Sequence, residues 1–157
     1  MKLFPGCVLL AVLACAACQS NVRPVEVKGM VYPPDIAAAI LWGAMDDGGT
    51  VMFVEADGIK TPQYWGQVFA HAIQLPPGPH ALKLKYFRIL DNFSSVAHGE
   101  VPVELEPGGT YVMKYAPGVN AVRLYIEKLP EGQTCSYIHS GDHGLIGIAP
   151  KYQLECR

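Results

Sequence analysis

A turn between two alternating segments constrains the fold of this chain more than any other feature of its sequence. Residues 100–105 alternate polar and apolar side chains, a Pro-Gly turn follows at 106–109, and residues 110–115 alternate again. A period of two on both sides of such a turn is typical of neighbouring half-buried strands. The side chains expected to face a core are Val101, Val103, Leu105, Tyr111, Met113 and Tyr115. Pro102 lacks an N–H group, so its strand is expected at a sheet edge.

Most of the remaining chain shows the same pattern of short apolar segments separated by turn residues. The 157 residues include 16 Gly and 13 Pro, and 50% of them are hydrophobic. Strands are expected at 25–31, 36–45, 51–56, 68–75, 80–87 and 121–129, and loops at 59–66 and 89–95. The alanines of 36–45 also suit a helix, but the neighbouring turn signals favour a strand. Strands recurring about every ten residues predict an all-β fold, an antiparallel β-sandwich of about seven to eight strands at 25–130.

The turn motif resembles a known structural device. Leu105-x-Pro107-Gly108-x-x-Tyr111 is similar to the tyrosine corner of fibronectin-type and immunoglobulin-like sandwiches. In that device the tyrosine hydroxyl bonds to upstream backbone. Residues 75–80 look like a second copy of the turn, with His80 in the place of the tyrosine.

A broader resemblance covers residues 38–129. The segments 54–58, 75–80, 105–111 and 122–126 together resemble small bacterial lipoproteins of unassigned function with a PEGA-like or transthyretin-like (prealbumin-like) sandwich. These are turn and core motifs, so the resemblance implies a fold and leaves the chemistry open. The C-terminal residues 131–157, with their two cysteines, depart from the pattern and are expected to form a tail pinned by a disulfide.

The N-terminus is predicted to be a signal peptide at 1–17. Lys2 precedes an apolar stretch that is too short to span a bilayer and ends in small residues. The sequence Ala16-Ala17-Cys18 resembles a lipobox, which implies acylation of Cys18 and a lipid-anchored tether at 18–24. Cys15 is the alternative acylation site. A second alternative is an ordinary secreted protein without a lipid, whose signal peptide is cleaved near these residues. Gln19 resembles the pattern of lipoproteins sent to an outer membrane, if the source is Gram-negative.

The cysteine count is consistent with this prediction. Of 5 cysteines, two leave with the signal peptide and Cys18 would carry lipid. Cys135 and Cys156 remain as an even pair, which predicts a disulfide in an oxidising compartment.

The tail also holds the only cluster of metal-ligand residue types, with His139, Asp142 and His143 near these cysteines. Zinc favours Cys and His, but the oxidising compartment favours the disulfide. We therefore expect no metal and no cofactor. Common hydrolase and phosphate-binding motifs are missing from the sequence, so we expect no catalytic residues and no enzyme activity.

Several aromatic and histidine residues are candidates for either a binding role or a structural role. Tyr64 and Trp65 lie in an expected loop and could contact a sugar or a partner protein, or cover an open end of the sandwich. Trp42 is expected in the core, and His71 and His80 are expected to be structural and hydrogen-bonded. The expected outer face of 121–129, with Arg123, Tyr125 and Glu127, is a weak candidate for a contact surface.

The charge of the chain argues against one class of partner, nucleic acid. The net charge is −2 and no basic patch suited to nucleic acid is visible. The sequence favours a non-enzymatic interaction module of the cell envelope, anchored to membrane lipid by its acyl chains at the periplasmic face of the outer membrane, with envelope proteins as possible partners. The alternative is a small-ligand or carbohydrate-binding module held at the same surface.

Overall fold

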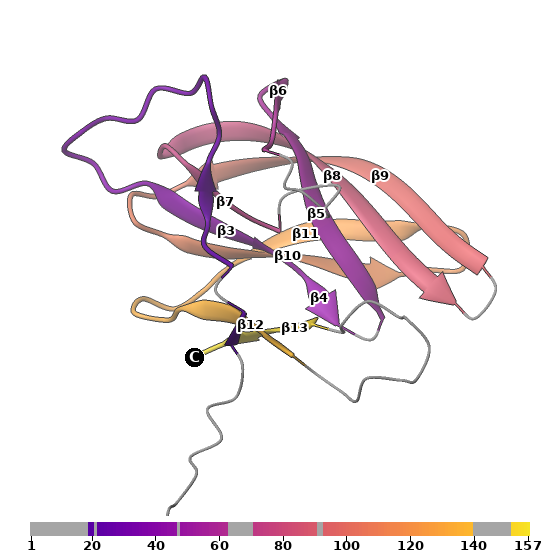
Figure 1. Cartoon of the computed structure of the whole chain (residues 1–157). Coiled ribbons are helices and arrows are strands. Elements are labelled where there is room, and N and C mark those ends of the chain that lie inside the picture. Colours follow the sequence, from indigo (N-terminus) through magenta and orange to yellow (C-terminus); the bar gives the residue numbers. More distant parts are fainter. Residues whose placement is uncertain (1–18, 21, 47, 63–70, 91–92, 140–151) are drawn as a thin grey trace, which may run out of the picture.

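The computed structural model describes residues 19–20, 22–46, 48–62, 71–90, 93–139 and 152–157 (Figure 1). Every regular element in these residues is a β-strand, which confirms the all-β prediction. The strands are β1 (Gln19–Ser20), β2 (Val25–Glu26), β3 (Ala39–Gly43), β4 (Met45–Asp46), β5 (Gly49–Ala56), β6 (Ile59–Lys60), β7 (Ala72–Leu75), β8 (Gly78–Leu90), β9 (Phe93–Leu105), β10 (Thr110–Pro117), β11 (Val122–Lys128), β12 (Cys135–His139) and β13 (Tyr152–Cys156).

The strands form two five-stranded sheets and one three-stranded sheet. The first, here the β10 sheet, has the order β11-β10-β3-β7-β2. The second, the β8 sheet, has the order β4-β5-β8-β9, and β6 pairs with β5. The third, the tail sheet, has the order β1-β12-β13 and lies beside the other two, near the C-terminus (Figure 1).

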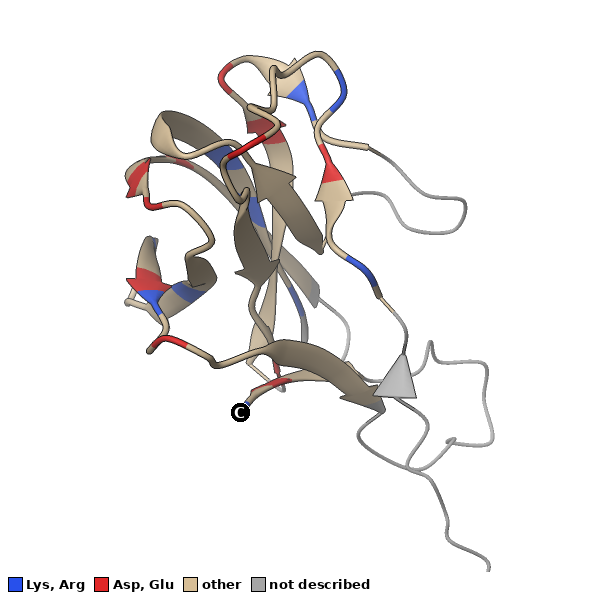
Figure 2. Cartoon of the chain, turned by 90° about the vertical axis from the view of Figure 1, so that its left-hand side faces the viewer, with Lys and Arg blue, Asp and Glu red and all other residues tan. Residues whose placement is uncertain are grey.

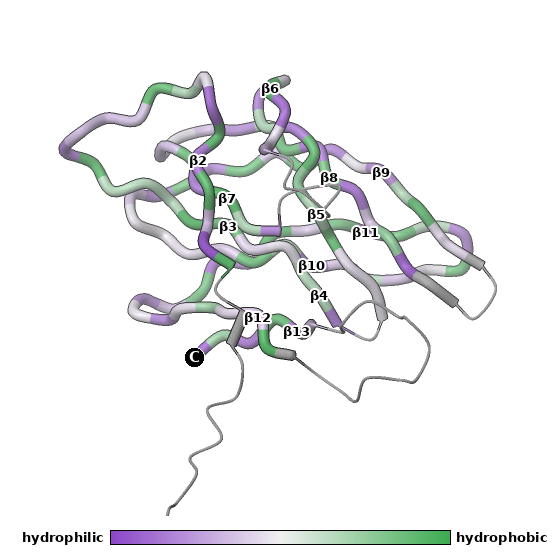
Figure 3. The backbone as a smooth tube through the Cα atoms, in the orientation of Figure 1, coloured by the Kyte–Doolittle hydropathy of each residue, from purple (hydrophilic) through white to green (hydrophobic). Residues whose placement is uncertain are grey.

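The main core lies between the β10 sheet and the β8 sheet. Leu41, Ile73 and Met113 from the first sheet and Phe53 and Leu84 from the second are 0% exposed and belong to one cluster. Apolar residues recur along the strands of both sheets (Figure 3), while Lys and Arg are interspersed with Asp and Glu over the described strands and turns (Figure 2). Burial of these apolar side chains is the main favourable term in folding.

The alternation that the sequence predicts at 100–115 is confirmed. Leu105, Tyr111 and Met113 are buried in the main core, and Val101 and Val103 pack against it. β9 is the last strand of the β8 sheet, so Pro102 does lie on an edge strand, as its missing N–H group requires.

The β10 sheet is mixed, which corrects the prediction of an antiparallel arrangement. β3 pairs in parallel with β10, and β2 pairs in parallel with β7. Between β3 and β10 the chain forms β7 of the same sheet and all strands of the β8 sheet, and parallel neighbours need long connections of this kind. Periodicity within single segments carries no information about these distant pairings.

The predicted loop at 89–95 is wrong. β8 continues to Leu90 and β9 begins at Phe93, with Arg88 paired to Ser95 and Ile89 to Ser94. Ile89 and Phe93 are of residue types that favour strands, and the ladder continues to the pair Leu90 and Phe93. Residues 91–92 lie outside the described residues.

The predicted strand at 36–45 is interrupted because the chain changes sheets at Ala44. The Ala44 N–H donates to Met113 O of the β10 sheet (3.0 Å), while Ala44 O accepts from Val51 N of the β8 sheet (2.8 Å). Gly43 allows this corner, since a Cβ there would lie 2.1 Å from Val51 O. β3 therefore belongs to one sheet and β4 to the other.

Two further segments differ from expectation. The predicted strand at 25–31 ends early, because the chain turns at Gly29, whose φ is 98°, and Met30 N donates to Val27 O (3.3 Å). In the predicted loop at 59–66, Ile59–Lys60 form β6 after the turn at Asp57-Gly58.

The tyrosine corner is present. The Glu106 N–H donates to the Tyr111 hydroxyl over 2.8 Å, and Tyr111 is 3% exposed. The turn needs Gly108, whose φ is 66°, and Gly109, where a Cβ would meet the Tyr111 ring at 2.7 Å. The hydrogen bond from Glu106 to the Tyr111 hydroxyl therefore connects the turn to the start of β10.

The related turn at 75–80 is tied by His80, which is hydrogen-bonded as predicted. Its Nε2 lies 2.8 Å from Pro76 O, and its Nδ1 lies 2.6 Å from the carboxylate of Asp57. Both partners are acceptors, so both bonds form together only when the ring carries two protons. Burial alone would raise the pKa of Asp57, but the hydrogen bonds from the Ala81 N–H and His80 outweigh it and lower that pKa.

We predict that Tyr111→Phe lowers the free energy of unfolding by about 1–2 kcal/mol, because the hydrogen bond from Glu106 is lost. Urea denaturation would measure the loss. The control is Tyr125→Phe, which removes a hydroxyl from the outer face of β11 and should cost less than about 0.5 kcal/mol. Equal stability of Tyr111→Phe and the wild type would show that the corner bond contributes nothing.

Candidate functional site: the C-terminal hairpin and its pocket

The predicted disulfide closes the C-terminal hairpin. Cys135 and Cys156 are direct partners in the β12–β13 ladder, with an S–S distance of 2.02 Å. Sulfur atoms joined in a disulfide are not thiolates, and the thiolate is the form that binds zinc. In the described residues no group of three or more His, Cys, Asp or Glu side chains could hold a metal ion.

Tyr137 fastens this hairpin to the β10 sheet. Its hydroxyl lies 2.7 Å from Gly43 O and 2.9 Å from His71 O, two acceptors on adjacent chain segments. Its ring packs edge-on against Trp42, with centroids 5.6 Å apart. Tyr137 is 1% exposed, and burial raises the pKa of its hydroxyl, which therefore stays a neutral donor at ordinary pH.

A second core lies between the hairpin and the outer face of the β10 sheet. Its buried members are Trp42, Ala72, Val112, Cys135 and Tyr137. The alternation at 110–115 places Val112 on the face away from the main core, yet it is only 4% exposed. The C-terminal residues are therefore a third layer of the domain, and they bury a sheet face that is otherwise open to solvent.

His71 departs in part from the prediction of a fully hydrogen-bonded histidine. Its Nδ1 is buried without a hydrogen-bond partner among the described residues. The ring lies edge-on to Tyr137, at 5.9 Å between centroids. Burial lowers the pKa of His71, which favours the neutral ring in this apolar junction.

The N-terminal residues join the same layer. Gln19 and Ser20, which the sequence assigns to a tether at 18–24, form β1 and pair with Ile138 and Tyr137 of β12. Val22 packs against the second core. The first residues after Cys18 are thus part of the tail sheet.

Most of the other predicted site residues fall outside the part of the chain that the structure describes. Cys18, Tyr64, Trp65, Asp142 and His143 lie outside the described residues, and His139 is described only as the last residue of β12. Trp42 is buried as predicted, although in the second core.

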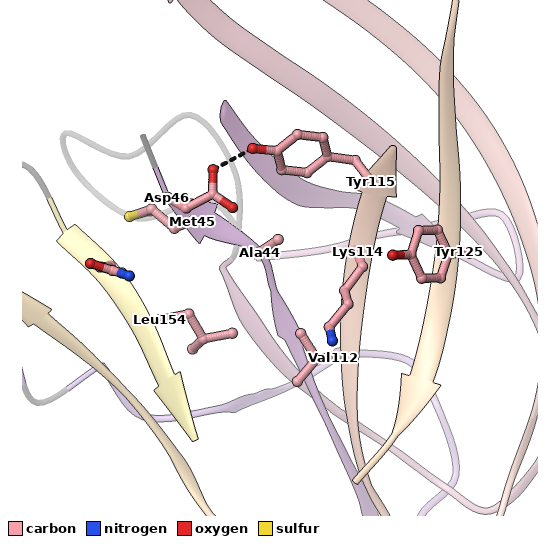
Figure 4. Close-up of a pocket in the computed structure, with 9 residues that line it drawn as sticks. Ala44, Met45, Asp46, Val112, Lys114, Tyr115, Tyr125 and Leu154 are labelled. Atoms are coloured by element: carbon pink, nitrogen blue, oxygen red, sulfur yellow. Dashed lines mark hydrogen bonds between the residues drawn. The ribbon is translucent and has the colours of Figure 1, made fainter. Parts of the chain in front are cut away.

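A pocket of about 230 Å³ opens where the hairpin ends on the outer face of the β10 sheet (Figure 4). Three parts of the chain form its walls: β4 with the preceding Ala44, the β10–β11 pair, and β13. The lining residues are Ala44, Met45, Asp46, Val112, Lys114, Tyr115, Tyr125, Gln153 and Leu154. Figure 4 shows Leu154 on β13 facing Val112 and Lys114 on β10.

Hydrogen bonds and an ion pair hold the charged groups of the pocket in place. One oxygen of Asp46, Oδ1, accepts from Gly48 N (2.7 Å), Gly49 N (3.1 Å) and the Tyr115 hydroxyl. Burial and the Asp46 carboxylate raise the pKa of Tyr115, so this hydroxyl keeps its proton. Lys114 forms an ion pair with Glu127. Of the residues that line the pocket, the sequence indicated only Tyr125 as a candidate contact residue. The pocket itself could not be predicted, because its residues come together through pairings between distant strands.

No protein family, curated protein or solved structure matches this chain in the comparisons made. Among the described residues, no helix is long and apolar enough to cross a membrane.

We predict that replacing both Cys135 and Cys156 with Ser lowers the free energy of unfolding by about 3 kcal/mol, as loop-closure entropy gives for a separation of 21 residues. Urea denaturation of the oxidised wild type and the double variant would test this. Treating both proteins with a reductant should remove the difference. A variant as stable as the oxidised wild type would show that the hairpin holds without the bond.

Proposed function

We propose that this protein is a non-enzymatic interaction module of the bacterial cell envelope, anchored by acyl chains on Cys18 to the periplasmic face of the outer membrane. We also propose that its two larger sheets form an immunoglobulin- or prealbumin-like sandwich. The lipobox-like sequence at 16–18 motivates the anchor. The main core between the two sheets supports the sandwich.

The pairing of β1 with β12 carries this proposal. Cys18 is bonded to Gln19, and neighbouring Cα atoms lie about 3.8 Å apart. Because Gln19 is already paired with Ile138, an acylated Cys18 would be attached directly to the tail sheet. A short attachment of this kind would hold the domain close to the lipid surface and limit the faces that a partner can reach.

The disulfide supports an extracytoplasmic location. Disulfides persist in the periplasm and in secreted proteins, whereas cytosolic thiols are kept reduced. The Cys135–Cys156 bond closes the hairpin that would carry the anchor, so the fold suits the compartment that the N-terminal segment predicts.

A second candidate function is the binding of a small ligand or carbohydrate at the membrane. The pocket beside the hairpin favours it, since it combines an apolar floor with Asp46, Gln153 and Tyr125. A ligand contact by Tyr64 and Trp65 stays a prediction.

Expression of the full chain in a Gram-negative host with an alkyne-labelled fatty acid would test the anchor. We predict that the wild type carries the label and sediments with membranes. Cys18→Ala should lose both properties, because the acceptor sulfur for the lipid is gone.

Cys15→Ala is the matched control, since it changes a cysteine three residues earlier, and it should keep the label. Loss of the label in Cys15→Ala but not in Cys18→Ala would move the anchor to Cys15. An unlabelled wild type would overturn the proposed anchoring altogether.

A further inference from the structure

We infer that the pocket between β4, the β10–β11 pair and β13 binds one ring of a neutral saccharide. This inference deepens the binding role proposed above and does not depend on the lipid anchor. It names a site that the sequence did not indicate, formed only when the tail hairpin packs on the β10 sheet.

The size of the pocket restricts its ligand. Its volume of about 230 Å³ is below the range of roughly 300–1,000 Å³ found for drug-sized ligands. One small ring fits this space better than an extended chain or a lipid tail.

The lining suits a ring with an apolar face and a polar rim. Ala44, Val112 and Leu154 supply apolar surface. Tyr125 adds an aromatic ring, which can cover a sugar face while its hydroxyl forms hydrogen bonds. Gln153 on the opposite wall offers both amide donors and an acceptor.

The charges argue against an ionic ligand. The Lys114 ammonium is already paired with Glu127, and Asp46 Oδ1 already accepts three hydrogen bonds. The Lys114 charge is therefore compensated by Glu127, and the Asp46 carboxylate is stabilised by hydrogen bonds from neutral groups. We expect the other Asp46 oxygen, Oδ2, to accept a hydrogen bond from a ligand hydroxyl group.

The arrangement is built before any ligand arrives. Asp46 is fixed by two backbone N–H groups and by Tyr115, whose own ring packs against Tyr86 at 4.8 Å. The opposite wall is fixed by Cys156, two residues after Leu154, through its disulfide with Cys135. A pre-organised site loses less conformational entropy on binding, which helps a small ligand with few contacts to bind.

The test uses the purified full chain in a detergent without a sugar headgroup. D-glucose, D-galactose and N-acetyl-D-glucosamine are each titrated at millimolar concentration and followed by saturation-transfer NMR. Hexanoate and hexylammonium serve as charged probes of similar size. We expect at least one of the three sugars to bind, and to bind more tightly than either charged probe.

Substitutions of pocket residues test whether the sugar binds in this pocket. Tyr125→Ala should weaken it by at least about tenfold, because the aromatic wall is lost, while Tyr125→Phe should stay within about threefold. Gln153→Ala, a change at an exposed position on the other wall, should weaken binding by about fivefold and provides a second test if Tyr125→Ala fails to fold. Val96→Ala truncates an exposed apolar side chain on β9, outside the pocket, and should change nothing.

The inference is overturned if none of the three sugars binds, if a charged probe binds more tightly, or if the pocket variants bind as the wild type does. These outcomes would leave the anchored module standing as long as Cys18 is acylated. An unlabelled Cys18 together with sugar binding would reject the anchor and keep the pocket.

Discussion

The hydroxyl of Tyr137 sits where three parts of the molecule meet. It donates toward Gly43 O and His71 O, on the outer face of the β10 sheet, while the backbone of Tyr137 pairs with Ser20 and Leu154. A buried phenol without a partner would cost about 1–3 kcal/mol, so this side chain strongly favours the docked position of the hairpin. The second core and the pocket depend on that position, as does the placement of β1.

Local signals predicted much of the fold. The corner at 105–111 could be predicted because its glycines, its turn and its tyrosine act within seven residues, and the bond from Glu106 to Tyr111 confirms it. The inward positions of β8 and β10 could be predicted because a period of two assigns faces without knowledge of the partner strand. The missing N–H group of Pro102 also predicted that its strand lies at a sheet edge.

Non-local pairings could not be predicted in the same way. The parallel pairing of β3 with β10 joins residues about seventy positions apart, and nothing in either segment encodes the partner. The C-terminal hairpin was expected as a pinned tail, because its strands are short and its cysteines indicate only that two points meet. The pocket was missed for the same reason, since it needs β4, β11 and β13 together.

The hairpin therefore links the proposed anchor to the proposed binding site. β12 pairs with β1 on one side and with β13 on the other, so an acyl chain on Cys18 would be joined through β1 and β12 to β13, which forms one wall of the pocket. A domain attached in this way would present the outer face of the β8 sheet away from its point of attachment, because the tail sheet packs on the β10 sheet. Partners would then be expected to approach the β8 sheet first.

Hydrogen exchange of the full chain, read by mass spectrometry on peptides covering 135–139 and 152–156, tests most directly whether the hairpin is an integral layer. If it is, these peptides are protected to within about tenfold of the peptide covering 110–117 in β10. Exchange of the hairpin as fast as that of an unfolded chain, while 110–117 stays protected, would contradict the three-layer structure.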